Sequence, residues 1–136
     1  MGWFSVALSL GGEDLDPAQI SQILGVEPTR GHAKGDPVAG TDRGVRRNGA
    51  WSRALKPGDT DEWDVGEVIR TLLADFPAPE EQWAQLPAGV SRRLRLGLEL
   101  ATANQGLSLA PDICAWLGQR GITVELDIYR ADERPR

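Results

Sequence analysis

The side chains best suited to chemistry lie in a Gly- and Pro-rich stretch between residues 25 and 49 and immediately after it. Arginine offers an anion two parallel N–H donors and lysine offers a point charge, so a loop that carries both can hold a phosphate or carboxylate. The candidate ligand-binding residues are Arg30, His32, Lys34, Asp36, Trp51 and Ser52. The glycine and lysine spacing of a P-loop is not present, which argues against that class of nucleotide site.

The same residues also have a structural interpretation. In it, Asp36 pairs with Arg30 or Lys34, and Trp51 fills the core of the domain. A loop of this length is uncommon in a small domain and is usually functional or disordered. Both interpretations stay open at this point, as does the order of the 25–49 loop.

One histidine and one cysteine limit nucleophilic and metal chemistry. His32 has the right chemistry for a general base near neutral pH, but no serine or cysteine nucleophile is recognisably placed beside it. Cys114 adjoins Ile113 and is expected to be a small buried hydrophobe. Two such residues cannot build a multi-ligand zinc site. We therefore assign no catalytic residue, metal or cofactor, and lean towards a protein that is not an enzyme.

Three segments alternate apolar and polar residues with period two, which predicts half-buried strands over 3–10, 93–100 and 122–129. A weaker candidate covers 49–55. Alternation places one face of the sheet on a core and leaves the other face open. Small side chains of the first strand and charged ones of the others favour a shallow, polar, concave surface there.

Tryptophan, tyrosine and arginine are common anchors of protein interfaces, so the outward face is a candidate binding surface. The candidate partner-binding residues are Trp3, Arg93, Arg95, Glu125, Asp127 and Tyr129. The alternative is a solvated face on which Arg93 and Arg95 form cross-strand ion pairs with the two acids.

Capping signals predict three helices. Asp16-Pro17 supplies an N-cap and a first-turn proline, and Gly25 suits the left-handed end of the helix. A second helix runs from Asp64 to Phe76, and a third begins at Pro111 and ends by Gly121. The order is β-α-β-α-β-α-β. The expected fold class is α+β, a two-layer sandwich of about four largely antiparallel or mixed strands with helices on one face.

A chain of 136 residues with 40% hydrophobic and 26% charged side chains predicts a single soluble domain over 1–136, with a flexible tail at 131–136. Apolar runs are too short to span a membrane, and no basic leader precedes the first apolar run. We expect a cytoplasmic protein without a membrane partner.

Charge is distributed unevenly along the chain. The net charge is −5, which argues against nucleic-acid binding, although residues 29–56 hold seven basic and two acidic side chains. The basic stretch either forms an anion-binding patch or pairs with the adjoining acidic segment, residues 57–82, which holds eight acids. The first acids of that segment favour a helix start or form a negative patch for a basic partner. This acidic run consists of Asp59, Asp61, Glu62, Asp64 and Glu67.

Four segments occur in a characteristic order. They are Asp14-Leu15-Asp16-Pro17; Leu24-Gly25-Val26-Glu27-Pro28-Thr29-Arg30 with Lys34-Gly35-Asp36-Pro37; Gly49-Ala50-Trp51-Ser52; and Gly106-Leu107-Ser108-Leu109 with Pro111, continuing to Leu126-Asp127-Ile128-Tyr129. In this order they resemble the bacterial family catalogued as domain of unknown function 4279. The chain departs from it at Ala110, where the family pattern implies a serine N-cap. The resemblance covers nearly the whole chain and implies a fold and a bacterial origin, not an activity.

Two functions remain open. The first is a non-catalytic protein-binding module, such as an immunity or antitoxin-like inhibitor, with a protein partner or a homodimer mate on the open face of the sheet. The alternative is a small anionic-ligand-binding protein or enzyme that uses the Arg30–Trp51 loop. The sequence identifies neither the partner, nor the ligand, nor the oligomeric state.

Overall fold

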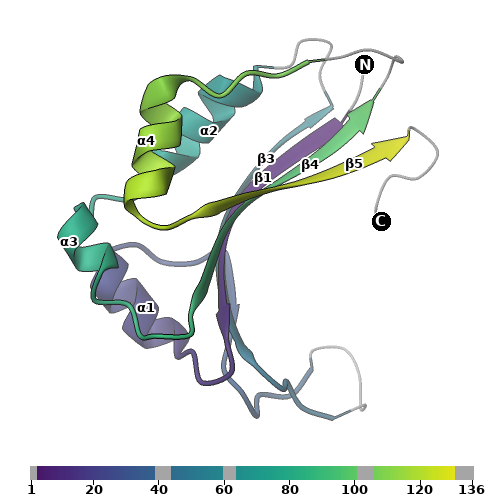
Figure 1. The fold of residues 1–136 in the computed structure, drawn as a ribbon. Coiled ribbons are helices and arrows are strands. Elements are labelled where there is room, and N and C mark those ends of the chain that lie inside the picture. The colour runs from purple at the N-terminus through teal and green to yellow at the C-terminus, as the bar shows by residue number, and fades with distance from the viewer. Residues whose placement is uncertain (1–2, 39–43, 60–63, 101–105, 131–136) are drawn as a thin grey trace.

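A computed structural model describes residues 3–38, 44–59, 64–100 and 106–130. The elements are β1 (Trp3–Gly12), α1 (Pro17–Leu24), β2 (Arg30–His32), β3 (Gly49–Asp59), α2 (Val65–Leu73), α3 (Glu80–Trp83), β4 (Ser91–Leu100), α4 (Pro111–Gln119) and β5 (Thr123–Arg130). They form two layers, one sheet with helices on one of its faces (Figure 1). The α+β class predicted from the sequence is confirmed.

The sheet has the strand order β2-β3-β1-β4-β5. Every neighbouring pair is antiparallel except β4 and β5, which are parallel. β3 lies between β1 and β2, and β1 lies between β3 and β4, so the connection through α1 and the connection through α2 and α3 each cross over an intervening strand, whereas α4 joins the neighbouring parallel strands β4 and β5. Crossovers of one hand place their helices on the same side of a sheet. This topology explains why the other face carries no helix among the described residues.

Two elements lie where the sequence analysis expected irregular chain. β2 occupies part of the 25–49 loop and raises the strand count from about four to five. The loop also contains a bridge between Pro37 and Val45, whereas residues 39–43 lie outside the described part. α3 is a single helical turn within the proline-rich segment 77–91. Both elements are too short to show a hydrophobic period. The tail at 131–136 also lies outside the described residues.

Local signals fix where the helices begin and end. Asp16 accepts a hydrogen bond from the Ala18 amide at 3.1 Å, and Gly25 adopts a left-handed φ of 71° after α1. α4 begins at Pro111 without a side-chain cap from Ala110. α2 ends at Leu73, three residues before the predicted end. After α2 the chain forms a tighter turn, in which the Phe76 amide donates a hydrogen bond to the Leu73 carbonyl at 3.1 Å.

The core lies between the helices and one face of the sheet. Alternate residues of β1 and β4 are buried there: Phe4, Val6, Leu8, Leu10, Leu94, Leu96 and Leu98. Trp51 of β3 is fully buried, and its indole N–H donates to Ser21 Oγ of α1 at 3.0 Å. Phe76 packs edge-on against Trp51 with ring centroids 5.9 Å apart. The expectation that Trp51 fills the core is confirmed.

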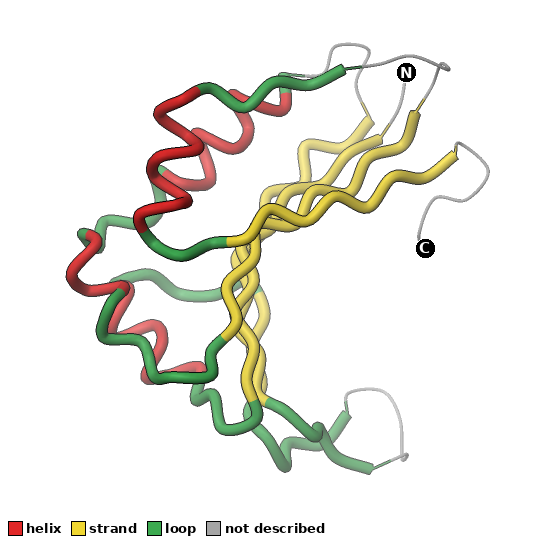
Figure 2. The backbone as a smooth tube through the Cα atoms, in the orientation of Figure 1, coloured by secondary structure: helices red, strands yellow, loops and turns green. Residues whose placement is uncertain are grey.

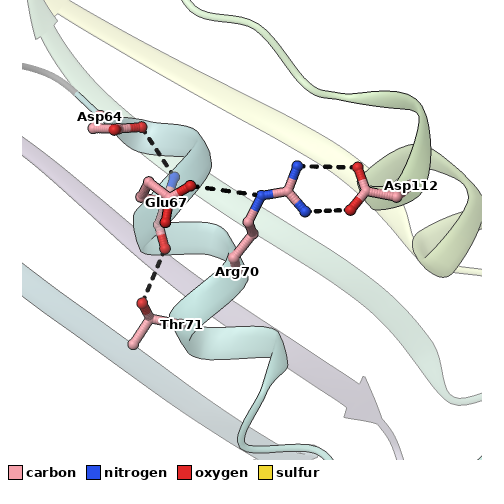
Figure 3. Close-up of polar contacts among 5 residues, drawn as sticks. All are labelled: Asp64, Glu67, Arg70, Thr71 and Asp112. Atoms are coloured by element: carbon pink, nitrogen blue, oxygen red, sulfur yellow. Dashed lines mark hydrogen bonds and ion pairs between the residues drawn. The ribbon is translucent and has the colours of Figure 1, made fainter.

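An ion pair connects α2 and α4 at the outer surface of the helical layer (Figure 3). Arg70 donates two hydrogen bonds to the carboxylate of Asp112, and its Nε lies 3.8 Å from Glu67. Asp64 caps the first turn of α2 by accepting from the Glu67 amide at 3.1 Å. The helix-start role expected for this acidic segment is therefore confirmed for Asp64. The Arg70 guanidinium lowers the pKa of Asp112, because it stabilises the charged carboxylate.

The sheet bends strongly, and the bend makes its helix-free face concave. Figure 2 shows α2 and α4 over one half of the bent sheet and α1 over the other half, with α3 between them at the level of the bend and all four on the convex side. A register shift between Phe4 and Val6 marks an irregularity in the β1–β3 pairing. Irregularities of this kind increase the twist and bend of a strand.

Candidate functional site

Strand register aligns side chains of the helix-free face in rows across the sheet. One row contains, from edge to edge, Arg30, Ser52, Ser9, Arg93 and Thr123. The adjacent row contains Ala54, Ala7, Arg95 and Glu125. Directly opposed residues in a sheet point to the same face. Arg30 therefore lies on the same surface as Arg93, and two serines separate them.

Small residues form the floor between these arginines. One depression of about 250 Å³ is lined by Ser9, Leu10, Gly11, Ala50, Trp51, Ser52, Ser91, Arg93 and Arg95. A second, of about 320 Å³, is lined by Ser5, Val6, Ala7, Thr29, Arg30, Ser52, Ala54 and Leu55. Ser52 lines both, so the two depressions adjoin. We call this combined hollow the trough. The sequence analysis expected a shallow, polar, concave surface on this face. The trough is a hollow in which hydroxyl and guanidinium groups lie among mostly apolar lining atoms.

Charges on one rim of the trough are partly compensated. Arg93 Nη1 lies 3.3 Å from Glu125 Oε2, and Arg95 Nε lies 3.2 Å from Glu125 Oε1. One carboxylate therefore serves two guanidinium groups, and both arginine side chains remain about half exposed. The cross-strand ion pairing expected for this face is confirmed at Glu125. No ion pair of Asp127 occurs within the described residues.

On the opposite rim, Arg30 is exposed and makes no ion pair within the part of the chain that the structure describes. Its strand, β2, is anchored by the residue that precedes it, because the Thr29 amide donates to the Ser52 carbonyl at 2.7 Å. Thr29 Oγ1 accepts from the Ala54 amide at 3.0 Å. The backbone beside Arg30 is thus fixed. The exposed Arg30 guanidinium, which has no ion pair among the described residues, can donate hydrogen bonds to an anion.

The residues predicted from the loop do not form one site. Arg30 and Ser52 lie together at the trough, but Trp51 belongs to the core on the other face. Lys34 Nζ donates to Glu13 at 2.9 Å, an ion pair that lowers the pKa of Glu13 and raises that of Lys34. His32 is half-buried and lies two residues after Arg30 in β2.

Asp36 corrects one detail of the sequence interpretation. Its carboxylate accepts a hydrogen bond from the Ala33 amide at 2.8 Å, and it pairs with neither Arg30 nor Lys34. An aspartate that caps its own turn in this way stabilises the loop locally. Asp36 is therefore a turn residue in this structure.

The basic stretch 29–56 is divided between structural pairing and the trough. Arg53 lies 3.0 Å from Asp75 and also donates to the Glu27 carbonyl at 2.8 Å. This contact confirms, for Arg53, the expected pairing with the adjoining acidic segment. Among the basic side chains of the stretch that the structure describes, Arg30 is the one that lines the trough.

The candidate partner-binding residues occupy one half of the helix-free face. Tyr129 is half-buried and lies opposite Glu99, which is 6% exposed, in the pairing of β4 with β5. Asp127 is exposed. The side chain of Trp3 lies outside what the structure describes, although its backbone belongs to β1.

Cys114 is exposed, so its predicted burial is wrong. Ile113 and Leu117 are the residues of α4 that face the core, and the next position after Ile113 turns away from it. The Cys114 thiol lies 3.7 Å from the Leu109 carbonyl oxygen. Neighbouring apolar residues in the sequence misled the prediction, because adjacent helix positions point about 100° apart.

Sequence reasoning did not join Arg30 and Ser52 to Arg93, although one signal was available. Trp51 is the large apolar residue of its segment, so Ser52 had to face outwards. What the sequence lacked was the pairing of β2 with β3, which brings Arg30 opposite Ser52.

The trough offers guanidinium and hydroxyl donors, which suit a carboxylate or a phosphate. Within the described residues, no group of three His, Cys, Asp or Glu side chains is placed to hold a metal ion. In the same part of the chain, no helix is long and apolar enough to cross a membrane.

Comparisons with known proteins identify a family but assign no activity. The comparisons with curated proteins and with solved structures gave no match. Residues 3–131, nearly the whole chain, match the family described as Domain of unknown function (DUF4279). The chain belongs to this family.

Proposed function

We propose that the protein is a non-catalytic binding module that holds an acidic segment of another protein in the trough. The observation that supports this most is the concave, small-residue floor with Arg30 on one rim and Arg93 and Arg95 on the other. Small side chains let a bound chain approach the sheet closely. Arginines on both sides supply bidentate donors for its carboxylates.

The spacing of the rims favours a segment over a single small anion. Arg30 and Arg93 are separated by three strand-to-strand steps, which is roughly 14 Å. Arg93 and Arg95 are held towards β5 by Glu125, away from Arg30. One carboxylate bound by Arg30 therefore leaves the other rim to a second acidic group, and a peptide can present both.

An inhibitor in the bacterial cytoplasm is the form of this function that we propose, comparable to an antitoxin or immunity protein that covers a working surface of its target. The net charge of −5 gives such a module selectivity. Long-range repulsion disfavours acidic surfaces in general, so only a segment shaped to the trough gains its local attraction.

The test uses a fluorescein-labelled decapeptide of alternating Glu and Thr, with a Lys-Thr peptide as its counterpart. Fluorescence anisotropy is measured at low and moderate salt for the wild type, Arg30→Ala and the double variant Arg93→Ala/Arg95→Ala. Arg47→Ala serves as the matched control, because Arg47 is exposed and does not line the trough.

We expect the wild type to bind the Glu peptide in a salt-sensitive way. Each trough variant should weaken binding about tenfold or more, and the control should not. Equal affinity for the Lys peptide, or an equal loss with Arg47→Ala, contradicts the proposal. Circular dichroism establishes that all variants fold alike.

A second function, binding of a small anionic ligand with or without catalysis, is favoured by the depression around Arg30. Thr29, Arg30 and Ser52 line its polar side, and Arg30 has no ion-pair partner among the described residues. A thermal-shift screen with phosphate-bearing metabolites tests it, since a ligand at 100 times its Kd stabilises a protein by about 2.7 kcal/mol.

In that screen, Arg30→Ala should abolish the shift, and Lys34→Ala should not, because Lys34 is engaged by Glu13. A shift that behaves in this way, together with no binding of the Glu peptide, replaces the first function by the second. No shift in the wild type rejects the small ligands that are screened.

A further inference from the structure

Strand β5 forms one edge of the sheet, and it has the features of a strand that accepts another. It spans eight residues, contains neither proline nor glycine, and pairs with β4 in continuous register from Thr123 to Arg130. In a parallel pair, alternate backbone groups of the edge strand point away from its neighbour. Within the described residues no strand pairs with that outer edge.

The helix-side surface of β5 is apolar and exposed at its centre, between the partly buried Val124 and the exposed Arg130. Leu126 lies opposite Leu96, and Ile128 lies opposite Leu98. The two β4 leucines are buried, whereas Leu126 is 48% exposed and Ile128 is 58% exposed. The hydrophobic stripe of the core therefore continues onto the edge strand and ends there in solvent. Natural edge strands usually carry charges or prolines that discourage such exposure.

The opposite surface of β5 is acidic. Glu125 is engaged by Arg93 and Arg95, but the exposed carboxylate of Asp127 has no hydrogen bond or ion pair within the described residues. An added strand would place its alternate side chains beside Leu126 and Ile128 on one face and beside Asp127 on the other. A cross-strand pair of opposite charges stabilises a sheet, and a pair of like charges destabilises it.

We propose that β5 accepts an extended segment of a partner protein as a sixth strand, in which apolar residues alternate with lysine or arginine. The apolar side chains cover Leu126 and Ile128, and a basic side chain meets Asp127. Main-chain hydrogen bonds to the outer edge of β5 supply affinity, and the alternation supplies register and specificity.

A second copy of the chain fits this edge less well. In an antiparallel pairing of two β5 strands, the register that opposes Leu126 to itself also opposes Glu125 to Asp127. The register that opposes Leu126 to Ile128 brings two Asp127 side chains together. The register that opposes Leu126 to Val124 brings two Glu125 side chains together. All three registers that place Leu126 against an apolar residue of the partner strand therefore place like charges opposite each other. A basic segment removes that conflict.

This surface is separate from the trough, so the two proposals stand or fall independently. The trough lies over β1 and β3 with its rims on β2 and β4, whereas the added strand would pair with β5. Variants at Asp127 and Ile128 leave every trough-lining residue in place.

The probe is a fluorescein-labelled nine-residue peptide of alternating Lys and Val with blocked ends, and its counterpart carries Glu in place of Lys. All affinities are measured on chains that also carry Arg30→Ala, which weakens trough binding of the Glu counterpart. The chain with Arg30→Ala alone then stands for the wild type beside Asp127→Lys and Ile128→Asp. Asp14→Lys is the matched control for net charge, because Asp14 is an exposed acid in the turn after β1. Both β5 side chains are exposed, so these variants should fold.

We expect the wild type to prefer the Lys peptide by about fivefold and Asp127→Lys to reverse that preference. Ile128→Asp should weaken the Lys peptide about tenfold, and Asp14→Lys should change its affinity less than twofold. Hydrogen exchange should show new protection at alternate amides of β5 when the Lys peptide is bound.

Equal affinity for the two peptides, an equal effect of Asp14→Lys and Asp127→Lys, or protection that excludes β5 overturns the proposal. A concentration-dependent dimer of the wild type that protects β5 amides also overturns it, because the occupant is then a second copy. Light scattering over a range of protein concentrations distinguishes that outcome.

Discussion

Trp51 and Ser52 are neighbours in β3, and they face opposite sides of one sheet. Trp51 is fully buried among the helices, with its indole N–H bonded to Ser21. Ser52 lies on the floor of the trough between Arg30 and Ser9. The two faces have different roles, because one buries apolar surface and the other presents polar donors. Substitutions at the core-facing positions of a strand should therefore lower stability, whereas substitutions at the alternate positions should weaken binding.

The largest expected effect comes from substituting these two neighbours. Trp51→Ala should lower the free energy of unfolding by about 3–5 kcal/mol, because it empties a large core volume and leaves Ser21 without its donor. Ser52→Ala should change it by about 0.5 kcal/mol or less. Urea unfolding of the two variants measures the difference.

Comparable losses for both variants would mean that the helix-free face also carries stability, and the division between the faces would fail. A Ser52→Ala protein that unfolds like the wild type but binds the acidic peptide more weakly would sharpen the division.

An intermediate effect is expected from glycines on the two faces. A Cβ added to Gly49 would lie 2.1 Å from the Leu15 carbonyl oxygen, a backbone atom, so Gly49→Ala must displace the chain. We expect a loss of about 1–3 kcal/mol. A Cβ added to Gly11, on the helix-free face, would lie 3.4 Å from Ser91 Oγ, which is an ordinary contact.

Gly11→Ala should therefore change stability by about 0.5 kcal/mol or less. Thermal unfolding of both variants is the measurement. A larger loss at Gly11 than at Gly49 would contradict the close approach between Leu15 and the start of β3.

The smallest expected effect belongs to the exposed ion pair over the helical layer. Arg70 lowers the pKa of Asp112 in the folded protein, so the pair contributes stability above the unfolded-state pKa of an aspartate, about 4. That contribution disappears as the pH falls through the lower folded-state pKa. Asp112→Asn should be slightly less stable than the wild type at pH 7.

The difference between Asp112→Asn and the wild type should vanish at low pH, and urea unfolding at pH 7 and at pH 2–3 tests this. A constant difference across that range would show that the asparagine acts through packing or the start of α4 instead of through charge.

Much of the fold followed from local patterns. Asp16, Pro17 and Gly25 bounded the first helix correctly, since each acts on neighbouring backbone groups. The three alternating segments gave three of the five strands. β2, three residues long, and α3, four residues long, escaped because a hydrophobic period needs more residues than either contains.

The candidate site was predictable only in part. Arg93, Arg95 and Glu125 were expected on one face by alternation, and their ion pairs confirm the placement. Arg30 was assigned to a separate loop site with Lys34. Their side chains in fact separate, because Lys34 is held by Glu13 while Arg30 reaches the trough through the pairing of β2 with β3.

The sequence by itself determined which side chains of the long strands share a face and where the three predicted helices start, because pleat and capping depend on neighbouring residues alone. Only the tertiary structure decided the strand order, and with it the row that joins Arg30, Ser52, Ser9 and Arg93. Those residues come from four strands that are distant along the chain. The crossover connections and the bend of the sheet bring these residues together, and neither can be recognised from the local sequence pattern.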